Sequence, residues 1–135
     1  MKNREADYSE QMRERYREDL FPQFLGIKLE EVRAGYARVS MEIKPEMHNF
    51  NSVTHGGAVF TLADTAFGLS SNTRGTALAL QISINYVRAS VSGERLIAEA
   101  EEEHLTKSTG VYRITVYRDK EMVALMRGTV FRKNK

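Results

Sequence analysis

A single carboxylate stands in a stretch of the sequence that is otherwise apolar or small. The stretch is HNFNSVTHGGAVFTLADTAF, residues 48–67, and the carboxylate is Asp64. Removal from water raises the pKa of a carboxylate, unless hydrogen bonds favour its charged form, and such a group can act as a general base near neutral pH. Two interpretations stay open: a catalytic Asp64, and a structural Asp64 that accepts hydrogen bonds from Thr61, Thr65 or a loop amide.

The glycine pair Gly56-Gly57 opens the helix that we predict over residues 56–72. The first amides of a helix have no partner within the helix and carry the positive end of its dipole. Glycines let a ligand oxygen approach these N–H groups, as in an oxyanion hole. The alternative is a tight turn with a capping side chain, and for His55 we favour a structural role that sets the loop. Asn49 could orient a water or a substrate carbonyl, or simply form a turn.

The predicted helix has two different faces at a period of 3.6 residues. One face is small and polar: Thr61, Asp64, Thr65, Gly68 and Asn72. The other is apolar, with Phe60 and Phe67 at its flanks: Val59, Leu62, Ala66 and Leu69. The helix is therefore expected to pack its apolar face on a sheet and to leave the polar strip elsewhere.

Strands surround this helix in the sequence. We predict a charged helix over 5–19, ended by Pro22 and Gly26, with a narrow apolar stripe of Tyr8, Met12, Tyr16 and Leu20. Six strand-like segments follow at 27–33, 36–43, 76–90, 94–106, 110–119 and 122–132, with a loop over 45–55. In the first segment after the long helix, period-two alternation places five residues on one face: Leu78, Leu80, Ile82, Ile84 and Tyr86. A six-stranded antiparallel sheet curled around the helix would cover its apolar face, which defines an α+β fold.

Composition limits the classes of function. The 135 residues suit one domain over 1–135, in which 1–22 form a helical extension. A net charge of +2 is too weak to indicate nucleic-acid binding, and no apolar run reaches the length of a membrane span. The absence of cysteine excludes disulfides, thiol nucleophiles and Cys-ligated metals, and it fits a cytoplasmic protein. His48 and His104 have no companions at metal-ligand spacing, so we expect no metal and no resident cofactor.

The combined spacing of Asn49, His55-Gly56-Gly57 and Asp64 resembles that of the hotdog-fold acyl-CoA thioesterases, in their PaaI-like, phenylacetic-acid-degradation branch. The segments FTLADTAFG, INY and RGTVF are similar to that branch too, and the resemblance covers roughly residues 25 to 132. It implies a homodimer whose sheets join edge to edge, often paired again into a tetramer. It also implies an active site between chains, with His55 and Gly56 from one chain and Asp64 from the other.

The resemblance further implies roles for individual residues. The Gly56 amide would polarise the thioester carbonyl, Asp64 would activate water or attack directly, and Asn49 would position water or the carbonyl. Where some relatives have a threonine one turn after the catalytic residue, this chain has Gly68, so Asn49 or Thr65 would hold the water.

Substrate contacts follow from the same resemblance. Gly57 and Thr65 are expected near the thioester. The candidate contacts for the CoA phosphates are Arg88, Thr106, Lys107 and Ser108, with Arg74 as a weaker one. A surface cation is otherwise usually just solvated.

We predict hydrolysis of small or aromatic acyl-CoA thioesters. The alternative is a hotdog protein that binds acyl-CoA without turnover, as a sensor or carrier. A hotdog dehydratase or hydratase ranks third, because the loop EMHNFNSVTHGG has no proline after Pro45. The acyl group stays open: four large apolar residues could line its pocket or pack in the core, namely Phe50, Phe60, Phe67 and Leu69.

Overall fold

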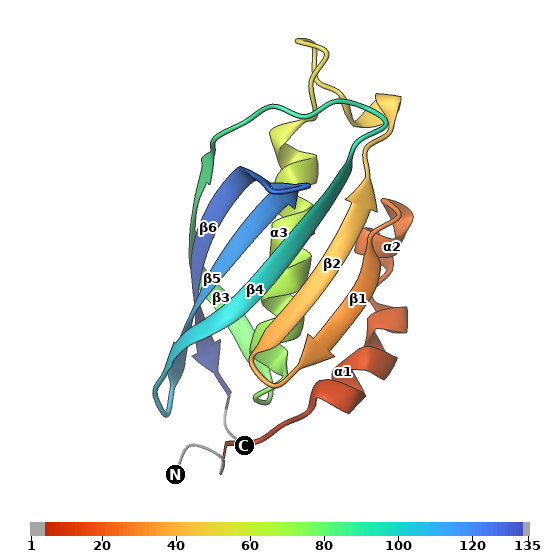
Figure 1. Cartoon of the computed structure of the whole chain (residues 1–135). Coiled ribbons are helices and arrows are strands. Elements are labelled where there is room, and N and C mark those ends of the chain that lie inside the picture. The colour runs from red at the N-terminus through yellow and green to blue at the C-terminus, as the bar shows by residue number, and fades with distance from the viewer. Residues whose placement is uncertain (1–4, 134–135) are drawn as a thin grey trace.

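The computed structural model describes residues 5–133. Six antiparallel strands form one sheet in the order β1-β2-β4-β5-β6-β3 (Figure 1). Their bounds are β1 Lys28–Arg33, β2 Tyr36–Glu42, β3 Ala77–Tyr86, β4 Arg95–Leu105, β5 Thr109–Arg118 and β6 Glu121–Arg132. The predicted α+β architecture is confirmed, and β1 and β3 are the two edge strands of the sheet.

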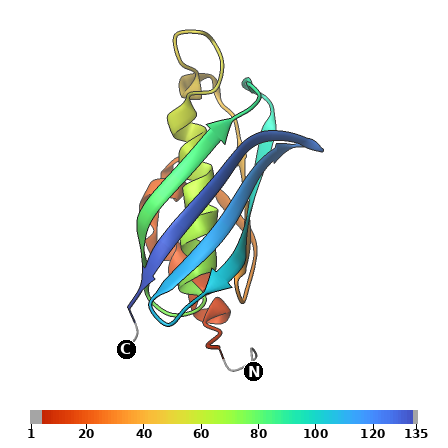
Figure 2. The same cartoon turned by 90° about the vertical axis from the view of Figure 1, so that its left-hand side faces the viewer.

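The long helix α3, Gly56–Asn72, has the predicted bounds and crosses one face of the sheet, which curls around it (Figures 1 and 2). Leu62, Ala63 and Ala66 are fully buried between the helix and the sheet. The fit is tightest where Phe67 faces β6, because a Cβ added at Gly128 would lie 2.5 Å from Cζ of that ring. The hotdog arrangement of one helix wrapped by a long sheet follows from this packing.

The prediction that five alternating residues of β3 share one face is wrong for part of the strand. The register between β3 and β6 shifts between Ala79 and Gln81, as in a β-bulge. A bulge inserts one extra residue and reverses the alternation beyond it. Ile82 and Ile84 pack against the core, whereas Leu78 and Leu80 are exposed.

The predicted single helix over 5–19 is also wrong. The segment forms α1, Ser9–Arg15, a 3-10 turn, Tyr16–Glu18, and a second short helix α2, Leu20–Phe24. Asp19 breaks the helix with a backbone that is not helical, and Pro22 is tolerated because it lies in the first turn of α2, where an amide has no partner anyway. The predicted extension 1–22 thus begins outside the described residues and continues as two helices.

The stripe expected on this extension is half correct. Tyr16 is buried, and its hydroxyl donates to the Ile27 carbonyl at 2.7 Å. Leu20, however, is 70% exposed. The extension packs along β1 and beside α3 (Figure 1), so it adds a wall to the outer side of the long helix. Among residues 5–133, none of the helices is long and apolar enough to cross a bilayer.

Candidate active site

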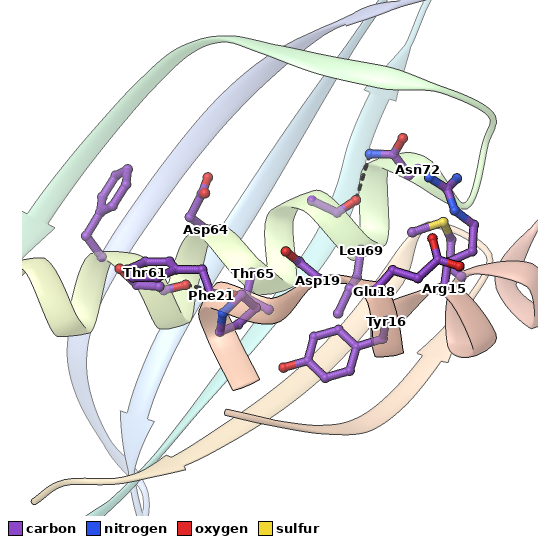
Figure 3. A pocket seen from close by; sticks show the side chains of 14 residues that line it. Arg15, Tyr16, Glu18, Asp19, Phe21, Thr61, Asp64, Thr65, Leu69 and Asn72 are labelled. Atoms are coloured by element: carbon purple, nitrogen blue, oxygen red, sulfur yellow. Dashed lines mark hydrogen bonds between the residues drawn. The ribbon is translucent and has the colours of Figure 1, made fainter. Parts of the chain in front are cut away.

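Asp64 lies half-buried on the side of α3 that faces away from the sheet. A cavity of about 560 Å³ separates it from the N-terminal extension. Figure 3 shows the side chains that line this cavity. The lining comes from both sides: Met12, Arg15, Tyr16, Glu18, Asp19, Phe21, Pro22, Phe60, Thr61, Asp64, Thr65, Gly68, Leu69 and Asn72. Such a volume is typical of a pocket for a small organic group.

The Asp64 carboxylate makes no hydrogen bond and no ion pair with any of residues 5–133. The two neighbouring threonines are committed to backbone carbonyls: Thr61 donates to the Gly57 carbonyl at 2.8 Å, and Thr65 donates to the Thr61 carbonyl at 2.7 Å. The donors that a structural Asp64 would require are therefore used elsewhere. A partly buried carboxylate without partners is expensive, which favours a functional explanation.

Burial raises the pKa of Asp64 above its ordinary value, and the negative charge of Asp19 raises this pKa further. Asp19 belongs to the extension and stands on the other side of the same cavity (Figure 3). Both causes disfavour the ionised carboxylate, so Asp64 is a stronger proton acceptor than an exposed aspartate. This is the direction that a general base acting near neutral pH requires.

The backbone N–H groups of Gly56 and Gly57 have different surroundings: one is bound by the helix cap and the other has no partner within the described chain. His55 is the N-cap of α3, and its Nδ1 accepts the Gly57 N–H at 2.9 Å. A neutral imidazole that accepts at Nδ1 carries its proton at Nε2, so the exposed edge of His55 is a donor. The Gly56 N–H has no acceptor within the described part of the chain. Gly56 is thus the amide left available to a ligand oxygen at this end of α3.

Tyr86, at the end of edge strand β3, holds the first turn of α3 in place. Its hydroxyl donates to the Gly56 carbonyl at 3.2 Å, and its ring would lie 3.4 Å from a Cβ at Gly56. A hollow of about 350 Å³ lies here, and its walls include Gly56, Tyr86 and Arg88. The Arg88 guanidinium donates to the Met122 carbonyl at 2.7 Å and is exposed.

Gly56 and Asp64 are too far apart to act together within one chain. Asp64 lies eight positions after Gly56 in the helix, which is a rise of about 12 Å. A general base and an oxyanion donor each need to lie about 3 Å from the reacting group. One chain therefore carries two separate candidate half-sites, one at the start of α3 and one at its middle.

The other predicted site residues are spread over the molecule. Asn49 uses its Oδ1 in a turn, where it accepts the Asn51 N–H at 2.8 Å. Thr106 and Ser108 lie in the β4–β5 turn, where the Thr106 hydroxyl accepts the Thr109 N–H at 2.9 Å. This turn, which also contains Lys107, lies at the end of the sheet opposite the start of α3 and the end of β3 (Figure 1).

Arg74 forms an ion pair with Glu102, in which its Nε lies 2.8 Å from Oε1. Within residues 5–133, no three His, Cys, Asp or Glu residues gather as metal ligands.

The four apolar candidates for the acyl pocket lie in different environments. Phe60 and Leu69 line the Asp64 cavity. Phe67 is buried and packs edge-on against Tyr112, with ring centroids 5.9 Å apart. Phe50 is 96% exposed in the loop before α3. The sequence reasoning missed Asp19 and Phe21 of the extension, because only the tertiary packing places them opposite Asp64.

The fold and the sequence have counterparts in known proteins. The sequence profile of the thioesterase superfamily matches residues 51–125. Over 115 residues the chain is 37% identical to the acyl-coenzyme A thioesterase PaaI of Escherichia coli strain K12, which covers 84% of this chain and 82% of that protein. A solved structure of the E. coli PaaI protein matches with a TM-score of 0.88 and 34% identity over 94% of this chain and 96% of that chain.

Two further solved structures are similar. A variant of the phenylacetic acid degradation protein PaaI from Thermus thermophilus has a TM-score of 0.83 and 40% identity, over 84% of this chain and 99% of that chain. A protein of Streptococcus mutans, solved with acetyl CoA bound, has a TM-score of 0.77 and 32% identity, over 81% of this chain and 90% of that chain.

A long helix wrapped by a six-stranded antiparallel sheet defines a protein of the hotdog fold. The chain belongs to the thioesterase superfamily, in the PaaI-like branch of acyl-CoA thioesterases. It is a thioester hydrolase.

Proposed function

We propose that this protein hydrolyses small or aromatic acyl-CoA thioesters to the free acid and CoA, with Asp64 as the general base. The observation that carries the proposal is the half-buried Asp64 carboxylate without a partner beside a cavity of about 560 Å³. The raised pKa of Asp64, caused first by burial and then by Asp19, supports the same role.

The residues suggest the following chemistry. Asp64 accepts a proton from water as the water oxygen attacks the thioester carbonyl. The negative charge that develops on the carbonyl oxygen is stabilised by the Gly56 N–H and the positive end of the α3 dipole. The tetrahedral intermediate then breaks its C–S bond and expels the CoA thiolate, which takes up the proton that Asp64 accepted and so restores the carboxylate. Direct attack by Asp64, with hydrolysis of the resulting anhydride, is the competing route.

Two copies of the chain complete this site in our proposal, because Gly56 and Asp64 of one chain lie about 12 Å apart along α3. The edge strand β3 offers the joining surface, since its outer edge has no neighbouring strand within the described chain and Leu80 on it is 64% exposed. Exposed apolar edge strands invite pairing with another chain. We propose a homodimer through β3, and a dimer of dimers as its further assembly.

The CoA moiety is assigned to the hollow beside Gly56, where Arg88 offers a cation for a phosphate. The acetyl CoA in the Streptococcus mutans relative supports this class of ligand. Within one chain, the Thr106–Ser108 turn lies at the end of the sheet opposite this hollow (Figure 1), so it would contact CoA only from the second copy.

The test is thiol release from acetyl-, hexanoyl-, phenylacetyl- and benzoyl-CoA by the wild type and by Asp64→Asn. We expect release by the wild type and a loss of about a thousandfold in the variant, the range for removal of a general base. Asp119→Asn, in the β5–β6 turn, is the matched control and should keep full activity. Equal rates for wild type and Asp64→Asn would overturn the role of Asp64. Binding without release by the wild type, measured by calorimetry, would indicate the non-catalytic alternative.

A further inference from the structure

The N-terminal extension forms one wall of the Asp64 cavity, and this wall is acidic. Asp19 and Glu18 line the cavity together with Asp64, and Arg15 is the one cation among the lining residues. Figure 3 shows Asp19 on the side nearer to Asp64, whereas Glu18 and Arg15 lie toward the Asn72 end of the cavity. Three carboxylates and one guanidinium thus line a space of about 560 Å³.

Local structure does not explain Asp19. Aspartate at a helix N-cap usually accepts a hydrogen bond from the first turn. Asp19 is the N-cap residue of α2, yet its side chain makes no capping bond. Neither Asp19 nor Glu18 forms an ion pair with another of residues 5–133. Both side chains are exposed, so water rather than a cation of this chain solvates their charges, and the negative charge of Asp19 still reaches Asp64, whose pKa it raises.

The remaining lining suits an uncharged acyl group. Phe21 of α2 and Phe60 and Leu69 of α3 provide apolar surface in the same cavity. If the proposed function holds, the carbonyl lies between Asp64 and Gly56 of a second chain, and CoA lies in the hollow beside that Gly56. The acyl tail then points away from the CoA side, into the cavity of the chain that supplies Asp64.

We propose that Asp19 is a specificity-determining residue that makes this thioesterase select uncharged acyl groups and reject acyl groups that end in a carboxylate. The terminal carboxylate of a dicarboxylic acyl-CoA would enter a space that already holds Asp19 and Glu18. Like charges near one another disfavour binding, and at the exposed Asp19 this repulsion is modest and is screened by salt. A neutral aliphatic or aromatic tail loses nothing to these charges and gains from burial against Phe21 and Leu69.

The experiment compares two thioesters of equal chain length, hexanoyl-CoA and adipoyl-CoA, which differ by the terminal carboxylate. The readout is the ratio of their kcat/KM values, because changes in the shared thioester chemistry cancel in it. We expect Asp19→Asn to raise kcat/KM for adipoyl-CoA about tenfold relative to hexanoyl-CoA, the size expected for removal of one nearby like charge. Asp119→Asn, an equal change of charge at a residue that does not line the cavity, should leave the ratio unchanged.

Salt gives a second readout that a merely structural role of Asp19 would not change. Raising the ionic strength from about 0.05 M to about 0.5 M should raise the wild-type kcat/KM for adipoyl-CoA relative to that for hexanoyl-CoA, because salt screens exposed charges. The same ratio for Asp19→Asn should stay nearly constant. An unchanged ratio in Asp19→Asn overturns the proposal. If the wild type hydrolyses neither thioester, the proposed function has failed, and calorimetry then measures the dissociation constants of the two thioesters. Tighter binding of adipoyl-CoA relative to hexanoyl-CoA in Asp19→Asn than in the wild type supports the role of Asp19. An equal ratio of dissociation constants, or no binding, overturns it.

Discussion

The side of α3 that faces the sheet and the side that faces the N-terminal extension differ in what their residues contact. On the sheet side, Leu62, Ala66 and Phe67 are buried in an apolar core. On the outer side, Asp64 has no partner among residues 5–133 and borders a cavity. The comparison indicates that the sheet side of α3 contributes to the stability of the fold, whereas the outer side carries the candidate catalytic group. Substitutions on the two faces should therefore change different measured quantities.

The largest expected effect is on activity alone. Asp64→Asn should lower kcat about a thousandfold and leave the thermal unfolding temperature equal or slightly higher. The sign follows from linkage: the pKa of Asp64 is raised in the folded state, so ionisation at neutral pH opposes folding, and the variant removes that cost. Calorimetry of unfolding at neutral pH measures it. A clear drop in unfolding temperature would mean that Asp64 is structural and would erase the contrast between the faces.

The amide at the start of α3 gives the next largest effect. Gly56→Pro removes the N–H, and we expect a loss of about a hundredfold in kcat. The fold should tolerate the change, because proline suits the first helical position and His55 already has the extended backbone that a following proline requires. Gly56→Ala is the matched control: it meets the same Tyr86 ring but keeps the donor. Equal activities of the two variants would exclude an oxyanion role.

A pair of glycine-to-alanine changes tests the sheet face against the outer face. Gly128→Ala should destabilise the fold by about 1–3 kcal/mol, since the new Cβ would lie 2.5 Å from the Phe67 ring. Gly68→Ala should stabilise it by about 0.5–1 kcal/mol, because nothing lies within 4 Å of the new Cβ and alanine favours the helix. Denaturant unfolding measures both. The same sign for both changes would contradict the different packing of the two faces.

The smallest expected effect is a displacement of the pH profile. Asp64 must be ionised to accept a proton, so log kcat should fall at low pH through the pKa of Asp64, which lies above its usual range. Asp19→Asn removes one cause of that raised pKa, and the acid limb should move to lower pH. Glu18, Arg15 and the neutral Tyr16 also line the cavity and are unchanged in this variant. An unmoved acid limb would show that Asp19 does not act on Asp64.

Much of the fold was predictable from local patterns. The 3.6-residue period and the glycine pair predicted α3 with its observed bounds, and the strand segments were predicted to within a few residues. The prediction failed where one residue changed a local rule. The bulge beside Leu80 moved Leu78 off the face of Ile82, and Asp19 divided the N-terminal segment into two helices.

The sequence by itself determined which groups this protein carries and their spacing along α3: the Gly56 amide, the Asp64 carboxylate, and about 12 Å between them. Local hydrogen bonding and side-chain periodicity suffice for that. Only the tertiary structure decided that Thr61 and Thr65 donate to backbone carbonyls and that Asp19 faces Asp64 across a cavity. Contacts between segments 45 residues apart depend on packing of the whole chain, and no local pattern encodes the surroundings of a carboxylate.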